Sequence, residues 1–240
     1  MSPAIRAPRT PWGNFPTVFI HASESAVKQY PSYRAAKSGD GNAAIVLVND
    51  VMSPLQNKNL LELVGRHRPT LVSAHAYESE GVNAIPEIFA DALGESLDWP
   101  VDAGVLQTNV VSHTGADGFA RLARQAEFGG SIQLGCEYVL VDDFVGMGGT
   151  LANMKGYIES QGGKVLAAVS LTGKPHSAKL ALSNERLQEL RLKHGTELEN
   201  WWLRRFAHSF DALTESEARY LTRTETSDTI RDRIIALQQA

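Results

Sequence analysis

The stretch from Tyr138 to Ala152 constrains the fold of this chain more than any other. It reads as an apolar strand over Tyr138–Val141, the acidic pair Asp142 and Asp143, a glycine-rich turn, and a helix that starts near Thr150. Glycines allow a tight turn and a close approach of the backbone to a ligand. The unpaired amides of a helix start lie at the positive end of the helix dipole. The turn therefore suits a phosphate group.

The acidic pair adds a second capability to the same turn. Two carboxylates accept hydrogen bonds from a sugar diol, directly or through a divalent cation, and the Thr150 hydroxyl adds a donor for a phosphate. A ribose 5-phosphate carries a phosphate and a diol at about this separation. The segment lacks the G-x-G-x-x-G of a dinucleotide site and the Gly-Lys-Ser/Thr of a P-loop, and Lys155 comes too late in the helix to serve as a P-loop lysine.

Strands and helices alternate around this segment. We expect strands at Thr70–Ala74, Val101–Leu106, Tyr138–Val141 and Val165–Leu171, and helices at Pro86–Ser96, Phe119–Glu127 and Thr150–Gly162. Such alternation predicts an α/β fold with a parallel sheet and right-handed crossovers. Ligands of such sheets bind at the carboxyl ends of the strands.

The region before His67 is less regular. We expect a short strand at Thr17–Ile20, a helix at Glu24–Lys37 that is interrupted near Pro31, and a helix at Asn57–Arg66. The apolar run Ala43–Val51 fits either a helix or a strand. Residues 1–16 carry four prolines and no apolar secretory segment, so an extended arm is expected.

The region from Pro175 onward is predicted to be helical. Thr196 with Glu199, and Thr214 with Glu217, match the capping box, and Thr229–Leu237 is amphipathic. An apolar stripe contains Leu198, Trp201, Trp202 and Phe206. The two tryptophans would either stack on a base or pack this helical cap onto the sheet, and packing is the favoured interpretation.

The composition narrows the classes of partner. The chain has 240 residues, a net charge of −4 and a single cysteine, Cys136. An acidic balance argues against nucleic acid as the main partner, and one cysteine excludes an internal disulfide and a cysteine-based zinc site. No apolar run is long enough for a membrane span. A cytoplasmic protein with no membrane partner is the expectation.

The acidic pair and its turn resemble the phosphoribosyl diphosphate (PRPP) signature of the type I phosphoribosyltransferases. In that family an apolar strand ends in two acids, two apolar residues follow, and a turn rich in threonine and glycine closes on Thr or Ser. The matching residues here are Asp142, Asp143, Phe144, Val145, Gly146, Met147, Gly148, Gly149 and Thr150. The resemblance implies a three-layer core at residues 69–174, an N-terminal extension at 1–68 that forms part of a hood, and a C-terminal helical cap at 175–240.

The same resemblance implies further parts of a site. The loop after the first core strand would bind pyrophosphate through His75, Ala76 and Gly81. A long mobile loop, Gln107–Gly130, would close over the reacting centre. Mg²⁺ would be bound indirectly by Asp142 and Asp143, through ribose hydroxyls or water. The implied assembly is a homodimer.

Several residues depart from the family pattern or extend it. Met147 replaces a common threonine, so one phosphate hydrogen bond is lost, and Gly146 replaces an acid that faces purines in one branch. Glu78 and Glu80 make the first loop acidic, which repels pyrophosphate unless a magnesium ion reverses the local charge. As catalytic candidates, the second loop adds Arg121, Arg124 and His113 to the two aspartates. If the two arginines share one helix face, they would stabilise a departing pyrophosphate; otherwise they would form a solvated surface. His113 would act as acid or base.

Three functions remain open at this point. The first is transfer of a 5-phosphoribosyl group from PRPP to a nitrogenous base. The second is a regulatory protein of the same fold that binds a phosphoribosyl compound without chemistry. The third is a phosphohydrolase or other sugar-phosphate enzyme. The acceptor base is not identified by the sequence.

Overall fold

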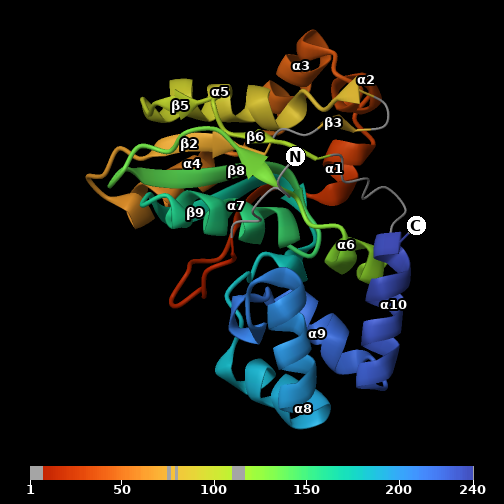
Figure 1. Ribbon diagram of the computed structural model, residues 1–240. Helices are drawn as coiled ribbons and strands as arrows, with labels where there is room; N and C mark the ends of the chain where they lie inside the picture. The colour runs from red at the N-terminus through yellow and green to blue at the C-terminus, as the bar shows by residue number, and fades with distance from the viewer. Residues whose placement is uncertain (1–7, 75–76, 79–80, 110–116, 240) are drawn as a thin grey trace.

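The sheet is parallel throughout and has five strands (Figure 1). The structure is a computed structural model, and it describes residues 8–74, 77–78, 81–109 and 117–239. The strands follow the order β1 (Phe19–Ala22), β9 (Lys164–Gly173), β8 (Glu137–Val145), β2 (Thr70–Ser73) and β5 (Val101–Asp102). The predicted α/β class with a parallel sheet is confirmed.

Helices cover both faces of the sheet, which gives three layers. One face carries α1 (Glu24–Lys28), α2 (Tyr33–Lys37), α3 (Gly41–Val51), α4 (Pro54–Val64) and α5 (Ile85–Leu97). Their buried side chains, among them Leu47, Leu60 and Phe89, meet Val141 and Leu171 of the sheet. The other face carries α7 (Gly149–Ser160). Burial of apolar side chains on both faces explains why the central strands read as continuous apolar runs.

The N-terminal arm lies against the α7 side of the sheet. Trp12 is buried in the same apolar cluster as Leu151 and Met154, and its indole Nε1 donates to the carbonyl oxygen of Leu213 at 2.9 Å. The arm therefore contacts both the sheet layer and the C-terminal region.

The C-terminal helices form a third apolar cluster, below the sheet in Figure 1. The elements are η1 (Pro175–Ser177), α8 (Asn184–Phe206), η2 (Phe210–Ala212), α9 (Glu215–Arg223) and α10 (Ser227–Gln239). The helix α6 (Gly118–Ala123) belongs to this cluster through Phe119 and Leu122. The helix α6, from the middle of the chain, thus packs against the C-terminal helices.

The tryptophans pack as expected, but against other partners. Trp202 is fully buried, with ring centroids of Phe206 and Phe210 at 4.4 and 6.0 Å. Among the described residues this cluster contains none from the parallel sheet. The prediction that the tryptophans attach the cap to the sheet is therefore wrong: they form the core of the cap itself.

Two strand predictions need correction. The expected strand Val101–Leu106 is divided into β5 and β6 (Leu106–Gln107), and β6 pairs with β7 (Phe128–Gly129). The cause is local, because the Asp102 carboxylate accepts a hydrogen bond from the Gly104 amide at 2.7 Å and turns the chain. The strand expected at Tyr138–Val141 continues to Val145, because β9 pairs alongside it up to Gly173.

Helix limits also differ from expectation. Ala43–Val51, ambiguous in sequence, is helical as part of α3. The helix expected at Phe119–Glu127 ends at Ala123, because the side chain of Asn109 binds the Gln125 carbonyl and the Glu127 amide.

One of the two predicted capping boxes is present. Thr214 and Glu217 form it at the start of α9. At the other position Gly195 interrupts α8, and the Glu199 carboxylate accepts hydrogen bonds from Arg191 and the Phe210 amide.

Candidate functional site

A cavity of about 290 Å³ opens where β8 ends and α7 begins. Among the described residues its lining includes five basic and three acidic side chains, although the whole chain has a net charge of −4. The basic residues are Arg9, Lys28, Lys37, Arg121 and Arg124, and the acidic residues are Asp142, Asp143 and Glu217. Positive charge is therefore concentrated in this cavity, as the binding of an anion requires.

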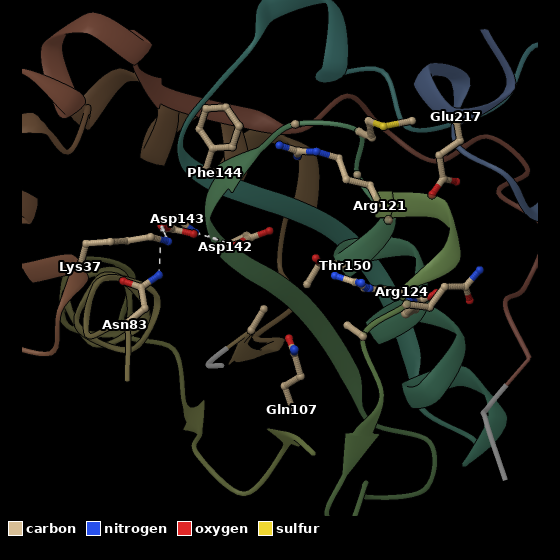
Figure 2. Close-up of a pocket in the computed structure, with 18 of the residues that line it drawn as sticks. Lys37, Asn83, Gln107, Arg121, Arg124, Asp142, Asp143, Phe144, Thr150 and Glu217 are labelled. Atoms are coloured by element: carbon tan, nitrogen blue, oxygen red, sulfur yellow. Dashed lines mark hydrogen bonds and ion pairs between the residues drawn. The ribbon is translucent and has the colours of Figure 1, made fainter. Parts of the chain in front are cut away.

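The predicted acidic pair lies inside the last part of β8, on the cavity wall (Figure 2). Both residues are more than nine-tenths buried. The Asp143 carboxylate accepts hydrogen bonds from Lys37 Nζ at 2.8 Å and from Asn83 Nδ2 at 3.0 Å. The Asp142 carboxylate accepts one from the Asp143 amide at 2.8 Å. The two carboxylates therefore have different surroundings.

These surroundings move the two pKa values in opposite directions. Burial, followed by the neighbouring charge of Asp143, raises the pKa of Asp142 well above its usual value. Burial also opposes ionisation of Asp143, but the charge of Lys37 and the hydrogen bonds from Lys37 and Asn83 outweigh it, so the pKa of Asp143 is lowered. Asp143 is therefore the more acidic member of the pair, and Asp142 is the member that is protonated first as the pH falls.

The glycine turn contains a left-handed residue at the start of α7, and the turn lines the cavity. Gly148 is the N-cap of α7, with φ of 82° in the left-handed region where glycine is favoured. Gly146, Met147, Gly148, Gly149 and Thr150 all line the cavity. Phe144 also lines it, whereas the Val145 side chain is fully buried in the core. Eight of the nine signature residues therefore line the cavity, and Val145 is the exception.

The two arginines of the second loop reach the same cavity. Arg121 belongs to α6 and Arg124 is its C-cap residue, and both line the wall. Burial lowers the pKa of the Arg121 guanidinium. The expectation that they share one helix face is wrong, because α6 ends at Ala123 and the two side chains extend to different parts of the cavity (Figure 2).

The pocket also contains residues that sequence reasoning missed. Lys28, Lys37 and Asn83 come from the α1–α2 region and from the segment before α5, and Arg9 comes from the N-terminal arm. Lys37 is 106 positions from the carboxylate it pairs with. No local pattern marks these residues, because their role depends on how distant segments pack.

A buried hydrogen-bonded cluster of Arg9, Glu217 and Asn153 lies in the cavity wall beside the first turn of α7. Arg9 Nη1 and Nη2 donate to the two oxygens of Glu217 at 2.6 and 3.0 Å, and its Nε donates to Asn153 Oδ1 at 2.5 Å. Glu217 also accepts the Thr214 amide at 2.9 Å. A Cβ on Gly149 would lie 2.9 Å from Glu217 Oε1. The N-terminal arm, α7 and α9 are therefore joined at the edge of the cavity.

Other predicted site residues are not placed in the cavity. His75, Ala76, Glu80 and His113 lie outside the described residues. Gly81 is in β4 (Gly81–Val82), which pairs with β3 (Tyr77–Glu78) in a short hairpin. Trp201 and Trp202 belong to the C-terminal cluster.

The donor set near the acidic pair bears on Mg²⁺. Within the described ranges no group of three or more His, Cys, Asp or Glu side chains is arranged to hold a metal. Magnesium commonly uses one or two carboxylates and takes its other ligands from water and substrate phosphates. Two adjacent carboxylates fit an ion that a phosphorylated substrate brings with it.

The fold and the pocket define a parallel α/β protein with a cationic cavity at the carboxyl ends of its strands. No protein-family model matches the chain. The chain is 38% identical over 236 residues, or 98% of its length, to Protein TraN of Escherichia coli. It is 35% identical over 151 residues, or 62% of its length, to an uncharacterized protein of Haemophilus influenzae. It spans 53% of the first relative and 34% of the second.

Solved structures with a related arrangement include phosphoribosyltransferases. An adenine phosphoribosyltransferase is 13% identical, with a TM-score of 0.36 and coverage of 62% of this chain and 75% of that one. The orotate phosphoribosyltransferase of Mycobacterium tuberculosis is 16% identical, with a TM-score of 0.30 and coverage of 60% and 79%. These scores are too low to carry a functional argument, which depends instead on the residues of the cavity.

None of the helices in the described parts of the chain combines the length and apolar character that a membrane crossing requires.

Proposed function

We propose that this chain binds PRPP and transfers its 5-phosphoribosyl group to a nitrogenous base, releasing pyrophosphate. One observation carries the proposal: a single cavity contains the buried acidic pair, the glycine turn at the start of α7, and Arg121 of α6 with the C-cap residue Arg124. PRPP has a 5-phosphate, a vicinal diol and a departing pyrophosphate, which the glycine turn, the acidic pair and the arginines respectively suit.

The roles follow from the chemistry of each group. Asp142 and Asp143 accept hydrogen bonds from the ribose hydroxyls, with Asp143 held in place by Lys37 and Asn83. The amides of the Gly146–Thr150 turn bind the 5-phosphate. Arg124, on the α6 wall, supplies positive charge for the leaving group.

In the transfer step the lone pair of the acceptor nitrogen forms a bond to the anomeric carbon of the ribose. The bond from that carbon to the pyrophosphate oxygen breaks, and its electron pair leaves with pyrophosphate. An acceptor nitrogen that carries hydrogen then loses a proton to solvent. Magnesium, bound with PRPP beside Asp142 and Asp143, would supply charge neutralisation of the pyrophosphate.

The acidic pair provides the first test. The double variant Asp142→Asn with Asp143→Asn should keep the fold, as measured by circular dichroism, and lose PRPP binding in calorimetry with Mg²⁺. A matched control, Asp228→Asn with Asp232→Asn, removes two exposed carboxylates from α10 and should bind PRPP normally. Equal PRPP affinity in the wild type and the first variant would refute the assignment of the site.

Binding without transfer is the second candidate function. Met147 favours it, because it lacks the hydroxyl expected at that position and one phosphate hydrogen bond is lost. Release of pyrophosphate from PRPP with any base in a panel would rule out this alternative. The homodimer and the cytoplasmic location also remain predictions.

A further inference from the structure

Phe144 gives the cavity a flat apolar surface next to the acidic pair. It follows Asp143 in β8, is partly exposed, and lines the cavity (Figure 2). Lys28 Nζ lies over the ring at 4.6 Å from its centroid. A planar ligand that packs on this ring would meet the acidic pair at one edge.

Arg121 brings a second cation to the same ring. A Cβ built on Gly146 would lie 2.9 Å from Arg121 Nη1 and 3.2 Å from Cε1 of Phe144. Figure 2 shows the Arg121 side chain extending toward Phe144, away from Arg124. Arg121 and Arg124 are thus directed to different parts of the cavity. Arg121 is near the aromatic ring.

Two of the three carboxylates that line the cavity have cationic partners of their own. Glu217 is paired with Arg9, and Asp143 with Lys37 and Asn83. Lys28 is paired with Glu24 at 2.5 Å, but both side chains are more than one-third exposed. Such a surface pair contributes little and can be exchanged for a ligand anion. The surroundings of the ring therefore favour a ligand with negative charge.

We propose that the acceptor is a flat heteroaromatic ring that carries a carboxylate, which packs on Phe144 and pairs with Lys28 and Arg121. This inference rests on the proposed function, because it names the acceptor of that same transfer. A neutral base has no group that requires two cations, and Gly146 offers no side-chain acceptor for an exocyclic amine. Lys28 and Arg121 are the residues that determine specificity, and Arg124 remains with the leaving group.

Pairs of bases that differ mainly in charge provide the test. Pyrophosphate release from PRPP and Mg²⁺ is measured with nicotinate against nicotinamide and with orotate against uracil. At least one carboxylated ring should react with a kcat/KM that exceeds that of its neutral counterpart by about a hundredfold, as two charged contacts of ordinary strength imply. Added salt should raise the KM of the carboxylated ring.

Variants identify the residues responsible. Lys28→Met should raise the KM of the carboxylated acceptor about tenfold, the loss of one charged contact, with the KM of PRPP unchanged. Lys58→Met is the matched control, because Lys58 is also exposed and forms an i,i+4 pair, with Glu62 on α4. It should change neither constant.

The possible results separate the two proposals. If PRPP does not bind, the proposed function fails. If PRPP binds and the neutral bases react as well as the carboxylated rings or better, transfer stands and the inference is overturned. If PRPP binds and no base reacts, binding of nicotinate and orotate to the PRPP-loaded protein is measured by calorimetry. Absence of binding by both rings overturns the inference, and binding abolished by Lys28→Met supports it.

Discussion

The buried ion pair between Arg9 and Glu217 allows a quantitative test of the structure. Both side chains are only 2% exposed. The substitution Glu217→Gln leaves the Arg9 guanidinium buried without its counter-charge. Breaking a buried pair in this way costs about 3–5 kcal/mol. Arg9→Met leaves the Glu217 carboxylate in the same position and should have a cost of similar size.

The double variant distinguishes this explanation from simple loss of packing. Arg9→Met with Glu217→Gln removes both charges, so it should cost much less than the two single changes together, with a coupling of about 2–3 kcal/mol. Some cost remains, because Asn153 Oδ1 loses a donor and the Thr214 amide keeps only a neutral acceptor. Urea unfolding followed by tryptophan fluorescence measures all four free energies. Single variants that cost less than about 1 kcal/mol, or an additive double variant, would refute the reasoning.

Two further predictions concern acid and the glycine turn. Burial lowers the pKa of His21 to about 4 and of His208 to about 3, so the folded state binds fewer protons than the unfolded state below pH 6.5. The free energy of unfolding should therefore fall from pH 6.5 towards pH 4, by about 3 kcal/mol for His21 alone at 1.36 kcal/mol per pH unit. His21→Gln should make this part of the profile less steep and leave the contribution of His208, and constant stability from pH 7 to 4.5 would contradict the prediction. Gly148→Ala should destabilise by about 2–4 kcal/mol, because a Cβ would strain a left-handed residue and meet Leu180 Cδ2 at 2.4 Å. Gly135→Ala, also left-handed but with open space around it, should show only the strain, and equal losses in thermal unfolding would disprove the packing argument.

Local sequence patterns were sufficient to predict the parallel sheet and the acidic pair with its glycine turn at the centre of the site. The apolar runs of β2, β8 and β9 and the Gly162–Gly163 helix stop appear in the sequence and in the structure. The strand and the helix that were predicted too long end at side-chain hydrogen bonds, which the apolar periodicity of the sequence does not reveal. The Asp102 side chain turns the chain inside an otherwise regular apolar stretch, and the side chain of Asn109 ends a helix whose apolar spacing continues.

The rest of the site depends on contacts between distant segments. Lys37 reaches Asp143 across 106 positions, and Arg9 reaches Glu217 across 208. The capping box of Thr214 and Glu217 was predicted, but its second role was not, because a sequence pattern does not reveal that the same carboxylate also binds Arg9 beside the cavity. The sequence therefore predicted residues whose role follows from a local pattern. It did not predict residues whose role depends on tertiary packing.

The acidic pair supports the proposed function more strongly than the glycine turn does. Gly148 and Gly149 are explained without a ligand, because Gly148 is left-handed and because Leu180 and Glu217 leave no space for a Cβ at either position. A glycine turn at a helix start would therefore occur here even in a protein that binds no phosphate. The buried acidic pair has no such explanation, since two adjacent carboxylates at the end of a central strand cost free energy unless a partner compensates them. Lys37 and Asn83 compensate Asp143, while Asp142 keeps a raised pKa in the cavity wall. The case for a ligand with a diol consequently rests on Asp142, and substitutions there test function more directly than substitutions in the glycine turn.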